Sequence, residues 1–187
     1  MTRLSVEELT RIALSVALLA VCSWISIPLM IPVTLQTFAV CLITALLGLK
    51  SGLWAVAAYI LLGAAGLPLF SGFRGGPAAL LGATGGYIAG FLFTALAVGL
   101  GGKRFGRRLP ALLLSMVLGV LLCYVFGTAW FMVVYTRNSG PVSLGVVLSW
   151  CVLPYLIPDG IKILLAALLA RRLGPVLSPA LYSGRRV

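Results

Sequence analysis

Long stretches without any charged residue dominate the hydrophobic pattern of this chain. Arg11 and Lys50 enclose 38 uncharged positions, and Lys50 and Arg74 enclose 23. Two uncharged stretches of 28 residues follow, and 21 uncharged positions separate Arg137 from Asp159. A helix needs about 20 mostly apolar residues to cross a lipid bilayer. The pattern therefore predicts an all-α integral membrane protein with a single membrane domain over residues 1–187.

Prolines and stretch lengths give the expected helix boundaries. Pro28 and Pro32 divide the first stretch into two helices. We expect six membrane helices, over residues 12–27, 35–49, 53–70, 78–100, 111–135 and 158–171. The apolar segment 143–153 would reach only about 17 Å as a helix, which is too short for a hydrocarbon core of about 30 Å. We interpret it as a short extra helix in the outer loop before the sixth membrane helix; a seventh span is the alternative.

The basic residues predict how the helices are oriented. Only Arg74 and Arg137 fall on one side of a six-helix arrangement, and Lys162 lies within the sixth helix. Basic loops stay in the cytoplasm, so we expect both termini there. The expected cytoplasmic bases are Arg3, Arg11, Lys50, Lys103, Arg104, Arg107, Arg108, Arg171, Arg172, Arg185 and Arg186. Because these bases are distributed as topology signals, the formal charge of +11 does not indicate nucleic-acid binding.

The composition excludes most enzyme chemistry. Charged residues make up 9% of the chain, against about 25% in a soluble domain. There is no histidine, and two of the three acids, Glu7 and Glu8, lie near the N-terminus, which leaves Asp159 alone in the body of the chain. A histidine-based triad and a paired-carboxylate hydrolase are thereby excluded. The four cysteines lack C-x-x-C spacing, so we expect neither a disulfide framework nor a metal site.

A glycine-rich region on the outer side is the first candidate site. Residues 63–77 and 82–87 contain many glycines, with Arg74 among them. Irregular backbone at membrane depth is tolerated only when it is buried in protein or lines a cavity. We therefore expect a loop folded over an outward cavity, with Arg74 binding an anion. The alternative is a flexible outer loop with one interfacial arginine.

Asp159 and Lys162 are the second candidate site. Their spacing of three residues places them on one helix face, and an ionisable pair within a membrane segment indicates function. The alternative is that Asp159 only caps its helix while Lys162 extends toward the membrane surface. Together with Arg74, the pair predicts a ligand with an anionic end and an N–H donor. We expect its apolar body to pack against aromatic side chains, namely Trp24, Phe70, Phe73 and Tyr87.

Four short segments carry a resemblance to a known family. Residues 31–38 read I-P-V-T-L-Q-T-F, and residues 66–72 read G-L-P-L-F-S-G. Residues 82–87 read G-A-T-G-G-Y, and residues 154–162 read P-Y-L-I-P-D-G-I-K. They resemble the signatures V-P-V-T-L-Q-T-F, G-L-P-V-F-S-G, G-P-T-G-G-Y and P-F-x-x-x-D-x-x-K of the BioY family, the biotin-specific S components of energy-coupling factor (ECF) transporters. The chain departs from these signatures with alanine at position 83 and tyrosine at position 155.

The resemblance implies a fold, a function and partners. It implies a six-helix S-component fold with an outward-facing biotin site, in a subunit without catalysis or a cofactor that mediates biotin uptake across a bacterial or archaeal plasma membrane. The implied partners are the coupling protein EcfT and two cytoplasmic ATPases, or further copies of the chain when it works alone. Ala13 and Ala17 match the alanine motif by which S components dock on EcfT, although such small-x-x-x-small pairs are common by chance in alanine-rich helices.

The resemblance also implies roles for individual residues. It places Asp159, Lys162 and Arg74 near biotin. We expect Asp159 to accept a hydrogen bond from a ureido N–H, and either Lys162 or Arg74 to meet the carboxylate or the ureido oxygen. Neutral hydrogen bonds would come from Thr34, Gln36 and Thr84. The competing hypotheses are an S component for another vitamin, a small membrane enzyme that uses Asp159 as a base, and a structural subunit without a ligand.

Overall fold

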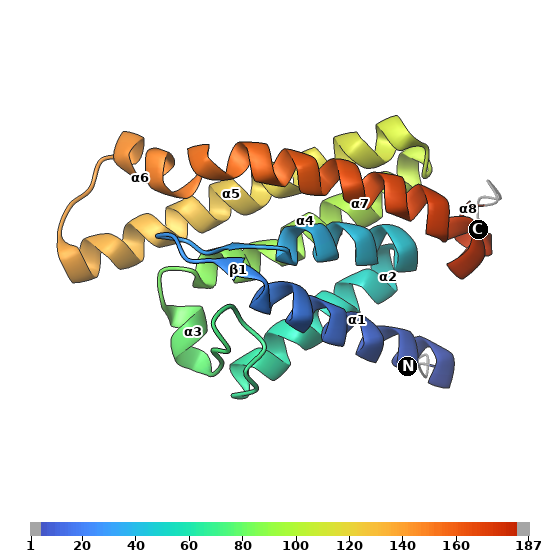
Figure 1. The fold of residues 1–187 in the computed structure, drawn as a ribbon, viewed down its shortest axis with the longest axis horizontal. Helices are drawn as coiled ribbons and strands as arrows, with labels where there is room; N and C mark the ends of the chain where they lie inside the picture. The colour runs from blue at the N-terminus through green and yellow to red at the C-terminus, as the bar shows by residue number, and fades with distance from the viewer. Residues whose placement is uncertain (1–4, 183–187) are drawn as a thin grey trace.

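The computed structural model describes residues 5–182 and confirms a mostly helical chain. Figure 1 shows long helices running side by side, with the start of α1 and the last helix, α8, at the same end of the molecule. Arg3, Arg185 and Arg186 of the predicted basic side lie outside the described residues. The helices are α1 (Val6–Trp24), α2 (Gln36–Ala64), α3 (Pro77–Leu81), α4 (Gly85–Phe105), α5 (Leu109–Ser139), α6 (Leu144–Cys151), η1 (Leu153–Tyr155), α7 (Leu156–Leu177) and α8 (Pro179–Tyr182).

The first helix begins earlier and ends earlier than the expected range of 12–27. It begins at Val6 because the Ser5 hydroxyl accepts a hydrogen bond from the Glu8 backbone N–H at 3.1 Å, which satisfies one of the free N–H groups of the first turn. It ends at Trp24 because the next residues form strand β1 (Ser26–Ile27), which pairs antiparallel with β2 (Val33–Thr34). Pro28 and Pro32, which the sequence places at the break between the first two helices, lie between the two strands of this hairpin.

Helix α2 consists of two helical segments that meet at Gly48. The φ and ψ angles of Gly48 are 83° and −177°, a conformation that only glycine adopts readily. The two segments lie in the positions of the helices expected at 35–49 and 53–70. The second one ends at Ala64, six residues early, because Gly66 has a φ of 109° and the Leu67 N–H donates to the Leu62 carbonyl at 3.2 Å. This is the Schellman ending of a helix.

The helix expected over 78–100 is interrupted. Helix α3 stops at Leu81, and α4 begins at Gly85 after a sharp turn. A Cβ atom at position 85 would lie 1.6 Å from the Leu80 carbonyl oxygen, so the turn requires glycine there. The glycine-rich sequence thus bends the backbone sharply before the long helix.

The later helices extend beyond their expected limits of 111–135 and 158–171. Helix α5 continues to Ser139, and α7 runs from Leu156 to Leu177. Arg137, Arg171 and Arg172 lie within these helices and are exposed. An arginine therefore marks the point where a helix extends beyond its apolar stretch, and the helix itself continues past that point. Helix α6 lies inside the segment 143–153, in the position expected for a short outer helix.

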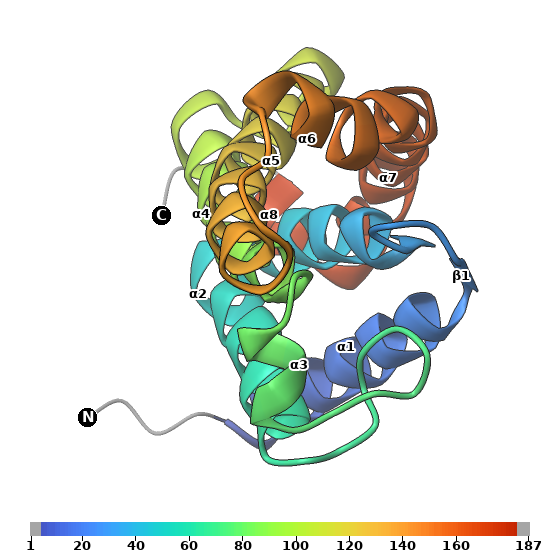
Figure 2. The same cartoon turned by 90° about the vertical axis from the view of Figure 1, so that its left-hand side faces the viewer.

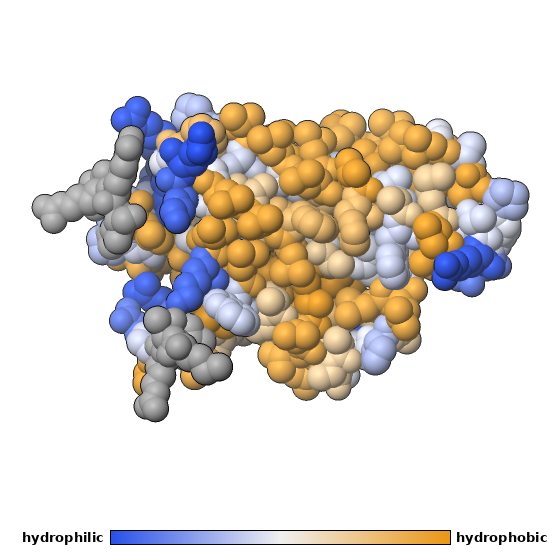
Figure 3. Space-filling model, turned by 180° about the vertical axis from the view of Figure 1, so that it is seen from behind, coloured by the Kyte–Doolittle hydropathy of each residue, from blue (hydrophilic) through white to orange (hydrophobic). Residues whose placement is uncertain are grey.

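Exposed apolar side chains cover much of the surface, as in a membrane protein. Four helical stretches are long and apolar enough to cross a bilayer, namely Gln36–Ala64, Gly85–Phe105, Leu109–Ser139 and Leu144–Leu177. Leu118, Leu122 and Val125 of α5 are about half exposed or more, and an apolar surface of this extent indicates contact with lipid. Figure 3 shows a wide hydrophobic band between hydrophilic side chains at the two ends of the molecule.

The long helices are arranged around a common centre. Figure 2 looks along the molecule from the end opposite the termini and shows α1, α2, α4, α5 and α7 arranged around the centre, with α3 and α6 at the near side. Helices α4 and α5 approach closely because Gly90 and Gly119 have no side chains: a Cβ atom at position 90 would lie 2.7 Å from the Cys123 sulfur. This packing fixes the walls of the site described below.

We predict that Gly48→Ala lowers the melting temperature of the purified protein in detergent. The substitution forces a side chain into a glycine-only conformation at a cost of about 1–3 kcal/mol, which corresponds to roughly 2–12 °C for a chain of this length. The new Cβ atom would also lie 3.3 Å from the Arg107 guanidinium. Gly145→Ala in α6 is the control, because open space surrounds that position. Equal melting temperatures for the two variants would contradict the prediction.

Candidate functional site

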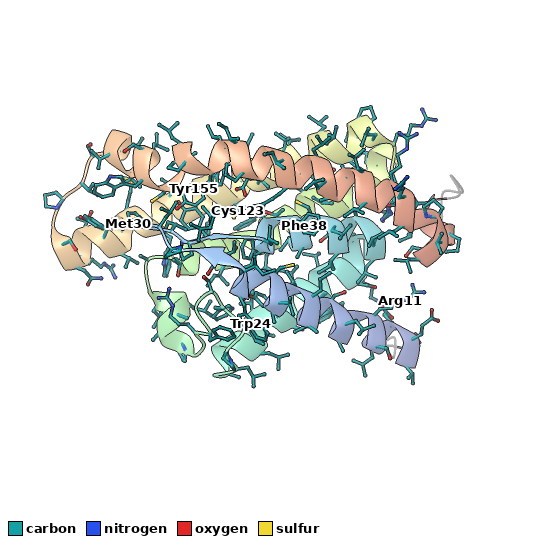
Figure 4. The ribbon with its side chains drawn as sticks, in the orientation of Figure 1. Arg11, Trp24, Met30, Phe38, Cys123 and Tyr155 are labelled. Carbon is teal, nitrogen blue, oxygen red and sulfur yellow. The ribbon has the colours of Figure 1, made fainter. Side chains whose placement is uncertain are left out.

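A cavity of ≈ 260 Å³ lies in the half of the molecule remote from the termini. Figure 4 labels three of its lining residues, Met30 of the β1–β2 hairpin, Cys123 of α5 and Tyr155 of η1, which lie close together in this half. Eight of the ten residues that the sequence predicts for ligand contact line this cavity: Thr34, Gln36, Phe70, Arg74, Thr84, Tyr87, Asp159 and Lys162. Four segments far apart in the sequence thus supply the wall of one cavity.

A buried ion pair forms the most polar part of the cavity wall. The Lys162 ammonium lies 2.7 Å from Asp159 Oδ1, and the two side chains are 9% and 7% exposed. Lys162 therefore turns inward to Asp159 and does not extend to the membrane surface. The hydroxyl of Tyr124 in α5 donates to Asp159 Oδ2 at 2.5 Å, so each carboxylate oxygen has a hydrogen-bond donor. Such pairing is what makes a charge tolerable inside an apolar bundle.

Arg74 reaches the cavity edge from a small hairpin. The Phe70 N–H donates to the Arg74 carbonyl at 2.9 Å, and the Arg74 N–H donates back to the Phe70 carbonyl at 3.2 Å. Phe70 is buried against the Tyr59 ring, with 5.5 Å between the ring centroids. The exposed Arg74 side chain donates to the Ser71 carbonyl at 3.2 Å and makes no salt bridge within the described part of the chain. Most of its donors therefore remain available to an anion.

A chain of neutral hydrogen bonds connects the hairpin β1–β2 to the loop that carries Phe70. The Thr34 hydroxyl donates to the Gln36 side-chain oxygen at 2.9 Å, and the Gln36 amide donates to the Tyr59 hydroxyl at 2.6 Å. Tyr59 in turn donates to the Leu69 carbonyl at 2.9 Å, which also accepts from Ser23 at 2.5 Å. Gln36 and Thr34 are thereby oriented before any ligand arrives.

Trp24 and Phe73 do not line the cavity, so the expectation that they pack the ligand is wrong. Their rings stack on each other with 5.0 Å between centroids, and the Trp24 indole N–H donates to the Pro68 carbonyl at 2.9 Å. Phe73 has a positive φ of 56° at the tip of the hairpin and is 64% exposed. The exposed Phe73 ring thus packs on Trp24 and does not reach the cavity.

Three tyrosines at the site escaped the sequence prediction. Tyr124 bonds Asp159, Tyr59 bonds Gln36, and the Tyr155 hydroxyl donates to the Ile31 carbonyl. A tyrosine within an apolar helix is a usable signal, because its hydroxyl needs a partner when it is buried. The sequence does not show which partner, since each of these bonds joins residues 23 to 124 positions apart.

Ala13 and Ala17 lie on an exposed face of α1. Both are exposed, and so are Leu14 and Leu18 beside them. The face is apolar and is open to lipid or to a partner helix.

A family model, curated relatives and a solved structure all match this chain to biotin transporters of one family. The chain matches the BioY family over residues 1–179. The biotin transporter BioY of Thermotoga maritima is 39% identical over 168 residues, which cover 89% of this chain and 95% of the relative. The probable biotin transporter BioY of Pyrococcus horikoshii is 38% identical, with 89% and 96% covered. The crystal structure of the S-component for biotin from an ECF-type ABC transporter matches with a TM-score of 0.80 and 29% identity over 90% of each chain.

We predict that Tyr59→Phe destabilises the protein. The variant keeps the ring against Phe70 but leaves the Gln36 amide without its acceptor, and loss of a buried partner costs about 1–3 kcal/mol. The melting temperature in detergent should fall below that of Tyr135→Phe, a control whose hydroxyl makes no hydrogen bond among the described residues. Equal stability of the two variants would show that the hydrogen-bond chain does not hold the loop.

Proposed function

Since this chain belongs to the BioY family, we propose that it is the biotin-binding membrane subunit of an ECF-type transporter. It is a transport subunit and not an enzyme, and it takes up biotin across a prokaryotic plasma membrane as a multi-pass protein. The observation that carries the proposal is the buried Asp159–Lys162 pair, which faces a cavity within an apolar bundle.

The polar groups of biotin match those of the inner cavity. Its ureido ring has two N–H donors and one carbonyl acceptor on a mostly apolar bicycle. Asp159 keeps unused lone pairs and accepts one ureido N–H, while Lys162 uses one donor on Asp159 and keeps two for the ureido oxygen. The apolar bicycle packs against side chains of the cavity wall, among them Ile88, Phe91 and Val120.

The biotin carboxylate has a separate partner at the cavity edge. The charge of Lys162 is already balanced by Asp159, so it gains little from a second carboxylate. Arg74 has an unbalanced charge, and its planar guanidinium can bind a carboxylate with two parallel hydrogen bonds. We therefore assign the carboxylate to Arg74, which orients biotin with its ureido ring inside and its valerate chain toward the opening.

The membrane topology follows from the same arrangement. Six crossings are formed by α1, the two segments of α2, α4, α5 and α7, and α6 lies on the outer side. The exposed bases Lys50, Lys103 and Arg171 support cytoplasmic termini, so that the cavity opens outward. The exposed face with Ala13 and Ala17 fits a coupling protein of the EcfT type. Two ATPases complete the transporter, because this sequence has no P-loop of its own; a homo-oligomer would serve a chain that works alone.

Asp159→Asn should weaken biotin binding by roughly a hundredfold or more, because loss of one member of a buried charged contact costs about 3–5 kcal/mol. Isothermal titration of the purified chain in detergent measures this loss. Glu7→Gln is the matched control, since Glu7 is an exposed acid of α1 outside the cavity, and it should bind like wild type. Wild-type affinity of Asp159→Asn would reject the assignment. If the purified chain retains another vitamin in place of biotin, as identified by mass spectrometry, the proposal that biotin is its substrate is wrong.

A ligand comparison tests the role of Arg74. Arg74→Gln should lower the affinity for biotin by roughly tenfold, as expected for a charge-assisted hydrogen bond. The same substitution should leave the affinity for biotinamide, whose tail is neutral, nearly unchanged. If Arg74→Gln weakens both ligands equally, Arg74 does not meet the carboxylate. If only Lys162→Gln removes the preference for a charged tail, biotin is bound in the reverse orientation.

A further inference from the structure

The two oxygens of the Asp159 carboxylate are held by donors of different character. Oδ1 accepts from Lys162, which lies one turn further along α7, and Oδ2 accepts from Tyr124 of α5. The lysine ammonium is a compact charge on a flexible four-carbon stem, so it attracts the carboxylate without fixing its direction. Tyrosine has a rigid ring and only two side-chain torsions. Tyr124 is thus the donor that determines the orientation of the carboxylate.

Tyr124 lines the cavity beside Asp159 and packs on its other side against apolar groups. Tyr124 is half-buried beside the core cluster that contains Met116 and Ile163, and its neighbours Leu121 and Val125 are lipid-facing. Its described hydrogen bond is the one to Asp159. A hydrogen bond to an ionised group is strong in such surroundings. The hydroxyl of this cavity-lining residue therefore acts on the ligand site through its hydrogen bond to the Asp159 carboxylate.

Without the Tyr124 bond, the carboxylate has an alternative arrangement. The last torsion of an aspartate side chain is broad and has no deep minima. The Asp159 carboxylate could rotate until both of its oxygens bind the Lys162 ammonium. We call this arrangement the closed pair. A closed pair offers neither a directed acceptor for a ureido N–H nor free lysine donors for the ureido oxygen. Tyr124 opposes this rotation by holding Oδ2.

We propose that Tyr124 is a positioning residue for ligand recognition. Its hydroxyl keeps Asp159 oriented to accept the ureido N–H, and it thereby sets how well this chain discriminates biotin from a biotin whose ureido nitrogen is methylated. The single proton of the hydroxyl is used in its hydrogen bond to Asp159. Tyr124 therefore cannot also donate to the ligand, and the ligand must supply the N–H that Asp159 accepts. The inference rests on the proposed function and deepens it.

Tyr124→Phe tests the proposal with two ligands, biotin and ureido-N-methylated biotin, on the same purified preparation. The biotin affinity should fall roughly 10- to 100-fold, the range for a hydrogen bond to a charged group. The affinity for the methylated ligand should change by about threefold or less, because that ligand already lacks the N–H contact. Discrimination between the ligands therefore decreases. Tyr135→Phe, on the same helix but away from the cavity wall, should retain wild-type affinity and discrimination.

A double-mutant cycle separates positioning from packing. In the Asp159→Asn background, Tyr124→Phe should change biotin affinity by about threefold or less, because the group it positions is gone. Equal losses for both ligands, or an additive loss in the Asp159→Asn background, would overturn the positioning role. The ratio of the two affinities does not depend on the folded fraction of a preparation. A wild-type chain that fails to bind biotin would overturn the proposed function and this inference together, whereas wild-type binding with an unchanged Tyr124→Phe would overturn only the inference.

Discussion

The one carboxylate inside this apolar bundle has to be neutralised by the protein, and the site is organised around that need. Asp159 is balanced by Lys162 and oriented by Tyr124, so α5 and α7 meet at a polar contact within otherwise apolar surfaces. Within an apolar bundle, a carboxylate without such partners would be costly to bury. The same requirement leaves a prepared acceptor and spare donors facing a cavity. The need to neutralise Asp159 in an apolar bundle thus also provides the polar groups that recognise the ligand.

Irregular backbone obeys the same constraint. The β1–β2 hairpin, the loop with the Phe70–Arg74 bridge and the turn at Gly85 interrupt the helices, and residues of all three segments or their immediate neighbours line the cavity. Their exposed peptide groups are tolerated because they bond to each other and to side chains such as Tyr59 and Ser23. These three non-helical segments are therefore concentrated at the site.

The sequence predicted the helical membrane class and eight of the residues that line the cavity, because charge-free stretches and short motifs are local signals. It did not predict Tyr124 and Tyr59 as partners of Asp159 and Gln36, since these contacts depend on which helices become neighbours. Helix ends were misplaced where an exposed arginine such as Arg171 lies within a helix that extends past the apolar zone. The stacking of Phe73 on Trp24 outside the cavity is a long-range contact that the sequence does not reveal.

A structure of this chain determined with biotin bound, by crystallography or electron microscopy, tests the central claim most directly. The account predicts a ureido nitrogen within about 3 Å of an Asp159 carboxylate oxygen, the ureido oxygen near Lys162, and the valerate carboxylate beside Arg74. Biotin bound in the reverse orientation, with its carboxylate on Lys162, or bound outside this cavity, would contradict it.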